Sequence, residues 1–137
     1  MKIFLATFTG LIVAFFSIAL LEPIGHFLFP VPFQVDLSNL SELKANMHLI
    51  PTGSYICVAI AHGLGLLFGL VVARLIEKEN RYPIFIIVGF IFFGTVANLF
   101  MLPHPLWFGV LDIITVSGVA TITILRLKKI EFIDHSE

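Results

Sequence analysis

The sequence predicts an all-α polytopic membrane protein in which four transmembrane helices form an antiparallel bundle with a short outer interfacial helix. Two observations carry this prediction. Of the 137 residues, 58% are hydrophobic and 12% are charged, whereas about a quarter of the residues of a soluble domain are charged. Four segments are also apolar over the roughly 20 residues that a helix needs to cross a bilayer core of about 30 Å.

The whole chain, residues 1–137, is predicted to form a single transmembrane domain. We expect spans over residues 3–29, 54–76, 84–102 and 106–127, an outer loop over 30–53 and a cytoplasmic tail over 128–137. The first span is expected to be retained, because no small-x-small cleavage site of a signal peptide follows it.

Pro23 interrupts the first span, since it removes a backbone donor and crowds the preceding turn. Ile24 and residues 27–29 remain apolar, and backbone at lipid depth must satisfy its own hydrogen bonds. We therefore expect a kinked helix that continues past Pro23. The alternative is a helix that ends at Glu22, followed by a turn.

Basic residues fix the expected orientation. The connections on one side of the spans hold nearly all of them, and the other side holds only Lys44. By the positive-inside rule both termini are expected to be cytoplasmic, in a multi-pass protein of the cell inner (cytoplasmic) membrane. The residues that set this orientation are Lys2, Arg74, Lys78, Arg81, Arg126, Lys128 and Lys129.

The outer loop contains a helical pattern. Leu37, Leu40, Leu43 and Met47 recur at helical spacing, which favours a short helix lying on the outer surface over a plain ordered loop. Asp36 or Ser38 is expected to cap its N-terminus.

Small residues are spaced by four in two spans, at Ala61, Gly65, Gly69 and Ala73 and again at Ala6, Gly10 and Ala14. Such stripes let helix backbones approach closely in lipid, so the first two spans are natural partners. The second stripe could equally support a homo-oligomer or a membrane partner. The lipid bilayer is the expected environment, and a net charge of -1 gives no reason to expect nucleic acid.

The few polar groups of the spans gather near the outer side. Counting 1.5 Å per residue from the outer helix ends places His62 about 12 Å, Asp112 about 9 Å and Asn98 about 6 Å deep. An ionisable group in a bilayer is either functional or half of a buried pair. We expect one outward-facing polar pocket formed by Glu22, His26, His62, Asn98, His104 and Asp112.

Several roles remain open for this pocket. It is structural, with His62, Asp112 and Asn98 paired to one another, or it binds a small ligand or partner. Alternatively, Glu22, His62 and Asp112 relay protons or ions in a transporter or channel component. A metal-binding membrane enzyme is the third alternative, with ligand candidates His26, His62, His104, Glu22 and Asp112.

The sequence favours a protein that is not an enzyme. No HExxH or HxxxH spacing is present, no cofactor is strongly implied, and no nucleophile is placed beside His62 and Asp112, so no catalytic residue is predicted. Cys57 is the single cysteine, which excludes a CxxC thiol redox mechanism.

Two stretches are distinctive: EPIGHFLFP at residues 22–30 and ANLFMLPHPLWF at residues 97–108. Together with the small-residue second span, they resemble a family of small uncharacterised bacterial membrane proteins with four spans. The resemblance covers nearly the whole chain. It implies the four-span architecture and no particular activity.

Overall fold

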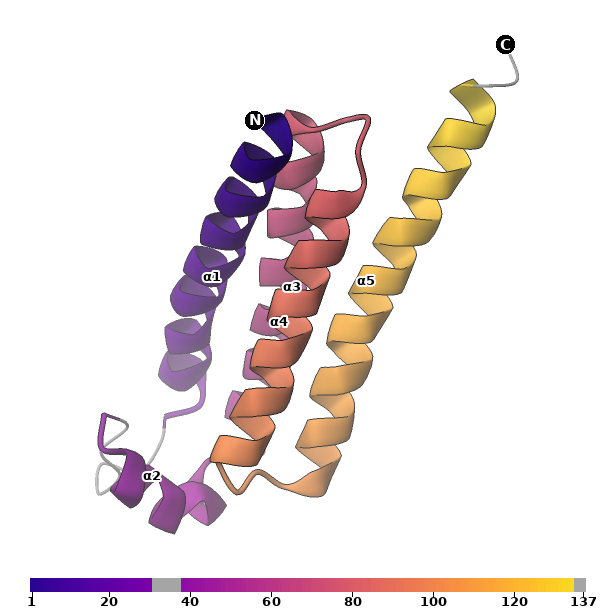
Figure 1. Cartoon of the computed structure of the whole chain (residues 1–137). Coiled ribbons are helices and arrows are strands. Elements are labelled where there is room, and N and C mark those ends of the chain that lie inside the picture. Colours follow the sequence, from indigo (N-terminus) through magenta and orange to yellow (C-terminus); the bar gives the residue numbers. More distant parts are fainter. Residues whose placement is uncertain (31–37, 135–137) are drawn as a thin grey trace.

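The computed structural model describes residues 1–30 and 38–134, with side chains described as far as Arg126. In this part the chain is helical throughout and contains no strand. Figure 1 shows four long helices side by side, with the N-terminus at one end and a short helix, α2, at the other. The helices are α1 (Lys2–Leu28), α2 (Leu40–Asn46), the 3-10 helix η1 (Met47–Leu49), α3 (Thr52–Ile76), α4 (Tyr82–Met101) and α5 (Leu106–Asp134).

Four of these helices, α1, α3, α4 and α5, are long and apolar enough to cross a membrane. The predicted four-span, all-helical fold class is therefore confirmed. The helix α1 continues through Pro23 to Leu28, as expected from the apolar residues beyond the proline. The last helix is longer than the predicted span over 106–127: α5 extends to Asp134 and includes most of the tail predicted over 128–137.

The helix α3 is the centre of the bundle. It packs against α1, α4 and α5, while α1 and α5 make no close backbone contact in the described part of the chain. An apolar cluster from all four spans fills the half of the bundle nearest the N-terminus. We call it the apolar plug; its buried members are Ala6, Ala14, Leu66, Leu70, Ala73, Ile84, Ile87, Ile91, Val116 and Ala120.

The contact between α1 and α3 is made by small residues, as predicted. A Cβ added to Gly69 would lie 2.6 Å from the Gly10 carbonyl oxygen and 2.8 Å from the Ala14 Cβ. The stripe of Ala61, Gly65, Gly69 and Ala73 is buried on the α1 side of α3. The helix α1 of the same chain covers Gly65 and Gly69 of this stripe, and the expected homo-oligomer or membrane partner stays a prediction.

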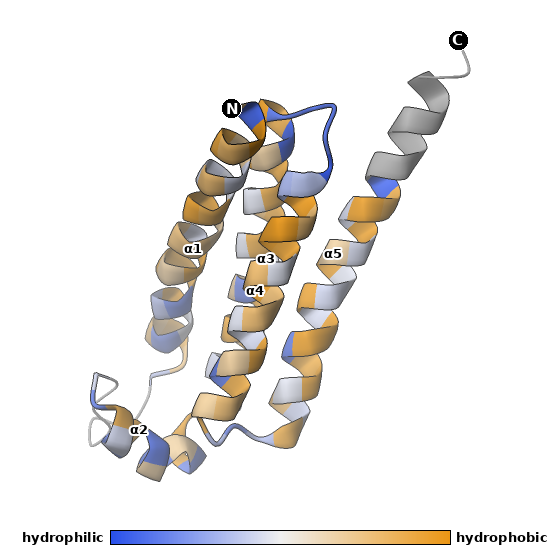
Figure 2. Ribbon diagram, viewed as in Figure 1, coloured by the Kyte–Doolittle hydropathy of each residue, from blue (hydrophilic) through white to orange (hydrophobic). Residues whose placement is uncertain are grey.

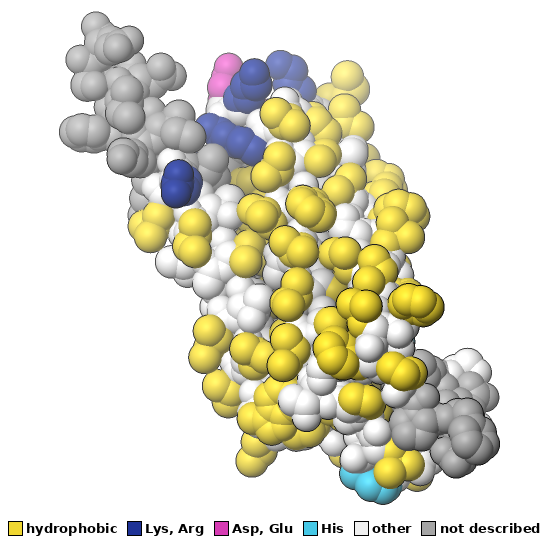
Figure 3. All heavy atoms as spheres, turned by 180° about the vertical axis from the view of Figure 1, so that it is seen from behind, with side chains coloured by type: hydrophobic (Ala, Val, Ile, Leu, Met, Phe, Trp, Pro, Cys, Tyr) yellow, Lys and Arg dark blue, Asp and Glu magenta, His cyan; other side chains and the backbone are white. Residues whose placement is uncertain are grey.

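Large apolar side chains cover the outside of the spans. Figure 3 shows them spread over the visible face, with Lys and Arg side chains gathered at one end of the bundle. The hydropathy colouring of Figure 2 likewise places hydrophilic residues toward the two ends of the bundle. We call the end with the N-terminus and the α3–α4 turn the basic end, and the end with α2 the pocket end.

At the basic end, Glu77 closes the turn after α3. Its Oε1 accepts hydrogen bonds from the backbone N–H groups of Glu79 and Asn80, at 3.0 and 3.1 Å. The bonds from Asn80 and Glu79 hold the pKa of this carboxyl below its ordinary value. An acceptor in this position satisfies donors that a tight turn leaves unpaired.

At the pocket end, the predicted interfacial helix is present, but its cap is different. Asn39, rather than Ser38, is the N-cap of α2, and its Oδ1 accepts from the N–H groups of Ser41 and Glu42. The helix begins two residues later than Ser38, which places Asn39 directly before it. Asp36 and Leu37 lie outside the described residues.

Two hydrogen bonds fasten this segment to α3. The Ser54 hydroxyl donates to the Phe29 carbonyl at 2.8 Å, and the Tyr55 hydroxyl donates to the Met47 carbonyl at 2.8 Å. The first bond joins the end of α1 to the start of α3, and the second joins η1 to α3. Consecutive residues of α3 therefore hold both ends of the outer connection.

We predict that Gly69→Ala destabilises the protein by about 1–3 kcal/mol, the range for overpacking a filled contact, because the added methyl group meets Gly10 backbone. Gly94→Ala is the matched control, since nothing lies within 4 Å of a Cβ at this position. Unfolding of both variants in mixed detergent micelles containing SDS measures the difference in their free energies of unfolding. Equal stability of the two variants would contradict the close contact.

Candidate functional site

The site is built around one imidazole. His62 comes from α3, and its Nδ1 lies 2.9 Å from both carboxylate oxygens of Asp112 on α5. Its Nε2 lies 3.4 Å from Oε1 of Glu22 on α1. The chain of side chains Glu22, His62 and Asp112, which we call the acid–histidine–acid chain, thus connects three spans, two of which do not pack directly on each other.

In the acid–histidine–acid chain, the position of one proton follows from the contact between His62 and Asp112. The short contact requires the Nδ1 of His62 to donate to Asp112, because a carboxylate accepts hydrogen bonds. The contact of Nε2 with Glu22 Oε1, at 3.4 Å, is longer than an ordinary hydrogen bond. Two carboxyl groups therefore flank one imidazole, which can balance at most one of their two charges when it is protonated.

The two acids have different surroundings. Asp112 is fully buried, at 0% exposure, so its charge depends on His62. The Glu22 side chain is 36% exposed and opens into a cavity. A buried acid with a fixed partner is typical of a structural pair, whereas an acid at a cavity wall is available to a ligand.

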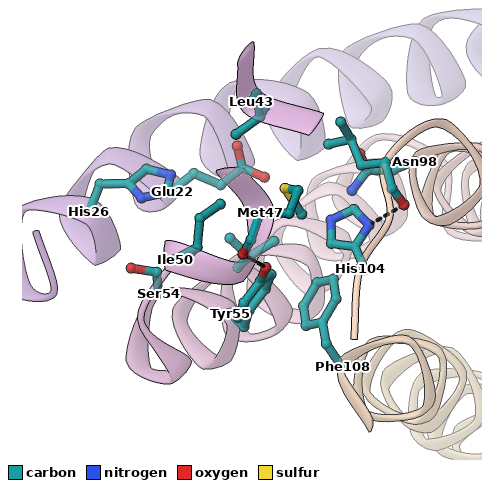
Figure 4. A pocket seen from close by; sticks show the side chains of 12 residues that line it. Glu22, His26, Leu43, Met47, Ile50, Ser54, Tyr55, Asn98, His104 and Phe108 are labelled. Carbon is teal, nitrogen blue, oxygen red and sulfur yellow. Dashed lines mark hydrogen bonds between the residues drawn. The ribbon is translucent and has the colours of Figure 1, made fainter. Parts of the chain in front are cut away.

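The cavity has a volume of about 190 Å³ and lies at the pocket end of the bundle. Figure 4 shows its lining side chains, which come from all four spans, from the connections at this end and from the α2–η1 segment. They are Glu22, His26, Leu43, Met47, Ile50, Ser54, Tyr55, Val58, Asn98, Leu102, His104 and Phe108.

The structure divides the six predicted pocket residues into two groups. Glu22, His26, Asn98 and His104 line the cavity, whereas His62 and Asp112 are outside the lining. Asn98 faces the cavity and makes no hydrogen bond to the other two within the described part of the chain. The expected pairing of His62 with Asp112 is present, and Glu22 connects this pair to the cavity.

His104 is a neutral hydrogen-bond acceptor toward the cavity. Its Nδ1 lies 3.0 Å from the Leu102 carbonyl oxygen, which can only accept, so Nδ1 carries the proton. Burial lowers the pKa of His104 below its ordinary value, so the ring is neutral at pH 7 and its Nε2 keeps a lone pair. In Figure 4 this second nitrogen points away from the Leu102 bond.

His26 presents a second unused ring nitrogen. Its Nδ1 is buried and has no hydrogen-bond partner among the residues that the structure describes. Buried polar atoms without a partner are rare in folded proteins. One turn of α1 separates His26 from Glu22, and both side chains line the same cavity.

Aromatic rings form one wall. Tyr55 lies at 5.1 Å from Phe108, and His104 lies at 4.9 Å from Phe108, measured between ring centroids. Trp107 packs edge-on against Tyr55 at 5.7 Å. Sequence reasoning did not assign Tyr55 to the pocket, and it missed Phe108 as a lining residue because Phe108 looks like any other apolar residue of the span.

The roof of the cavity was also missed. Leu43, Met47 and Ile50 of the outer connection face the cavity, where the helical pattern predicted only contact with a surface. The spacing of Leu43 and Met47 by four residues was the available signal, since it places both on one face. Nothing in the sequence indicated what that face would cover.

The described side chains hold no group of three or more His, Cys, Asp or Glu residues placed to bind a metal ion. The geometry explains this. The two acids lie at opposite nitrogens of the His62 ring, so the imidazole separates them instead of joining them around one point.

Four apolar spans around an acid–histidine–acid chain define the class: a multi-pass integral membrane protein with a mostly apolar cavity at one end. Comparison of the chain with protein-family models, with curated proteins and with solved structures found no match. The resemblance to a small bacterial four-span family stays a prediction.

A double-mutant cycle tests the buried pair. Asp112→Leu and His62→Leu each leave one polar partner buried without its bond, so each is expected to be strongly destabilising. The double variant removes both groups and is expected to be more stable than the sum of the single effects predicts, with a coupling of about 0.5–3 kcal/mol. Unfolding in mixed micelles provides the four free energies, and simple additivity would show that the pair contributes nothing.

Proposed function

We propose that this membrane protein binds a small solute in the cavity at its pocket end, with Glu22 as the polar anchor. One observation carries the proposal: Glu22 is held by His62 on one side and opens into the cavity on the other. The buried His62–Asp112 pair positions the carboxyl group. Pre-positioned polar groups in a mostly apolar cavity are typical of ligand sites.

The cavity size limits the solute. A volume of about 190 Å³ equals about six water molecules at about 30 Å³ each. Sites for drug-sized ligands are larger, at about 300–1,000 Å³. The proposed solute is therefore no larger than a few non-hydrogen atoms, or is the end of a larger molecule.

The apolar plug supports binding over passage. Its residues fill the bundle between the acid–histidine–acid chain and the basic end. Leu66, Leu70 and Ile87, for example, have 0% exposure. A hydrated path through this half would have to separate these contacts, so the cavity of the described conformation serves one side of the membrane.

We predict that small solutes raise the unfolding temperature of the purified protein and that Val58→Phe abolishes the effect. Val58 lines the cavity, so the larger ring fills it. Val71→Phe on the same helix is the matched control, because Val71 is 48% exposed on the outside of the bundle. A panel of small amines, carboxylic acids, alcohols and amides is sufficient. Stabilisation of wild type and Val58→Phe alike would place binding elsewhere.

We further propose that the pocket end faces outward from a bacterial inner membrane and that both termini are cytoplasmic. The support is the concentration of Lys and Arg at the basic end (Figure 3), which the positive-inside rule assigns to the cytoplasm.

Cysteine labelling checks the orientation. In a Cys57→Ser background, an impermeant maleimide is expected to label Lys44→Cys in spheroplasts, whereas Glu79→Cys is labelled only after the membrane is opened. Both native side chains are exposed, so reactivity reports the side of the membrane. The reverse pattern would overturn the orientation.

A second candidate function is proton-coupled transport. The contacts of His62 with both Glu22 and Asp112 favour it, since proton relays in membranes use chains of acidic and histidine side chains. We expect a pH gradient to drive uptake into proteoliposomes of any solute that the binding panel identifies, and His62→Ala and Asp112→Asn to abolish it. If both variants leave pH-dependent uptake unchanged, the transport candidate fails.

A further inference from the structure

We propose that the solute is a primary ammonium ion, either a free small amine or the amine of a lipid headgroup, whose N–H groups bind Glu22, His104 and His26. The inference rests on the proposed binding function and names its ligand class.

The polar lining offers acceptors where an ammonium ion offers three donors. The Glu22 carboxyl group, the Nε2 of His104 and the buried, unpartnered Nδ1 of His26 can each accept. The one hydroxyl donor of the aromatic wall, that of Tyr55, is already bonded to the Met47 carbonyl. A ligand rich in donors therefore complements these three acceptors, and the amide of Asn98, which also lines the cavity, can both donate and accept.

The charges at the site also favour a cationic ligand. No Lys or Arg is among the residues that line the cavity. The acid–histidine–acid chain holds two carboxyl groups against one imidazole, so ionised acids leave at least one negative charge unbalanced, and a lone charge at lipid depth is costly. His26 faces this charge from α1 and His104 faces it from the α4–α5 connection. A bound cation would balance this charge.

The aromatic wall supports an organic cation over an inorganic one. The Phe108 ring lies 5.1 Å from that of Tyr55 and 4.9 Å from that of His104, measured between centroids, and ammonium groups bind the faces of aromatic rings. Calcium needs six to eight oxygen ligands, whereas the cavity lining holds a single carboxylate. The small volume restricts the group to an amine of a few non-hydrogen atoms or to the amine end of a larger molecule.

Titration calorimetry of the full chain in phosphatidylcholine nanodiscs, with ethylammonium chloride as the probe, tests the inference. We expect saturable binding of ethylammonium and none of sodium acetate or ethanol. Glu22→Gln is expected to weaken binding at least tenfold, because it removes the charged acceptor. Glu79→Gln, an exposed acid at the basic end, is the matched control and is expected to leave binding unchanged.

His104→Leu gives an independent variant if Glu22→Gln does not fold. It removes a neutral acceptor and is expected to weaken binding about two- to tenfold. Nanodiscs that contain phosphatidylethanolamine distinguish the two amine sources. Competition of this lipid with ethylammonium assigns the site to a headgroup, and absence of competition assigns it to a free amine.

The outcomes separate the two proposals. If acetate or ethanol binds in a manner sensitive to Val58→Phe and ethylammonium does not, the ligand class is wrong and the binding site stands. Equal affinity of ethylammonium for wild type and Glu22→Gln also overturns the ligand class. If no solute of the panel binds, the proposed function itself fails.

Discussion

The contact on which the rest of this structure depends is the imidazole of His62 held between two acids. It joins α1 and α5 through α3, although α1 and α5 share no direct packing in the described part of the chain. Each acid alone would be costly in lipid, but a single ring with two nitrogens accommodates both. One residue of the central helix thereby fixes the rotation of two neighbouring helices about their axes.

The same contact divides structural from available polar groups. Both carboxylate oxygens of Asp112 contact His62. Glu22 Oε1 lies 3.4 Å from His62 Nε2, beyond the usual length of a hydrogen bond, and the Glu22 side chain stays partly exposed. The apolar plug on one side and the α2–η1 segment on the other then leave a small, half-open space in front of Glu22. The structural pair and the proposed binding group are therefore neighbours in one chain of side chains, so the two roles are compatible.

Most of the fold could be predicted, because span length and hydropathy depend only on local sequence. The predicted span over 54–76 and the observed helix Thr52–Ile76 differ by two residues. The site was predicted in part, since depth along a helix follows from residue number but rotation about its axis does not. Hence His62 and Asp112 were placed in the lining with Glu22. The roof of the cavity and the Asn39 cap depend on how the connection folds back, which no periodicity reports.

The position of Asp112 on the last span also bears on how the chain enters the membrane during synthesis. A carboxylate at the centre of a helix adds about 2.5–3.5 kcal/mol to the cost of insertion, which is an upper limit for Asp112 in the outer half of its span, and α5 is the least apolar of the four spans. Its partner, His62, is made fifty residues earlier and stands on the central helix before α5 leaves the ribosome. Because α3 precedes α5 in the sequence, His62 is already present when Asp112 enters the membrane. A chain in which α5 were made first would have to insert Asp112 unpaired.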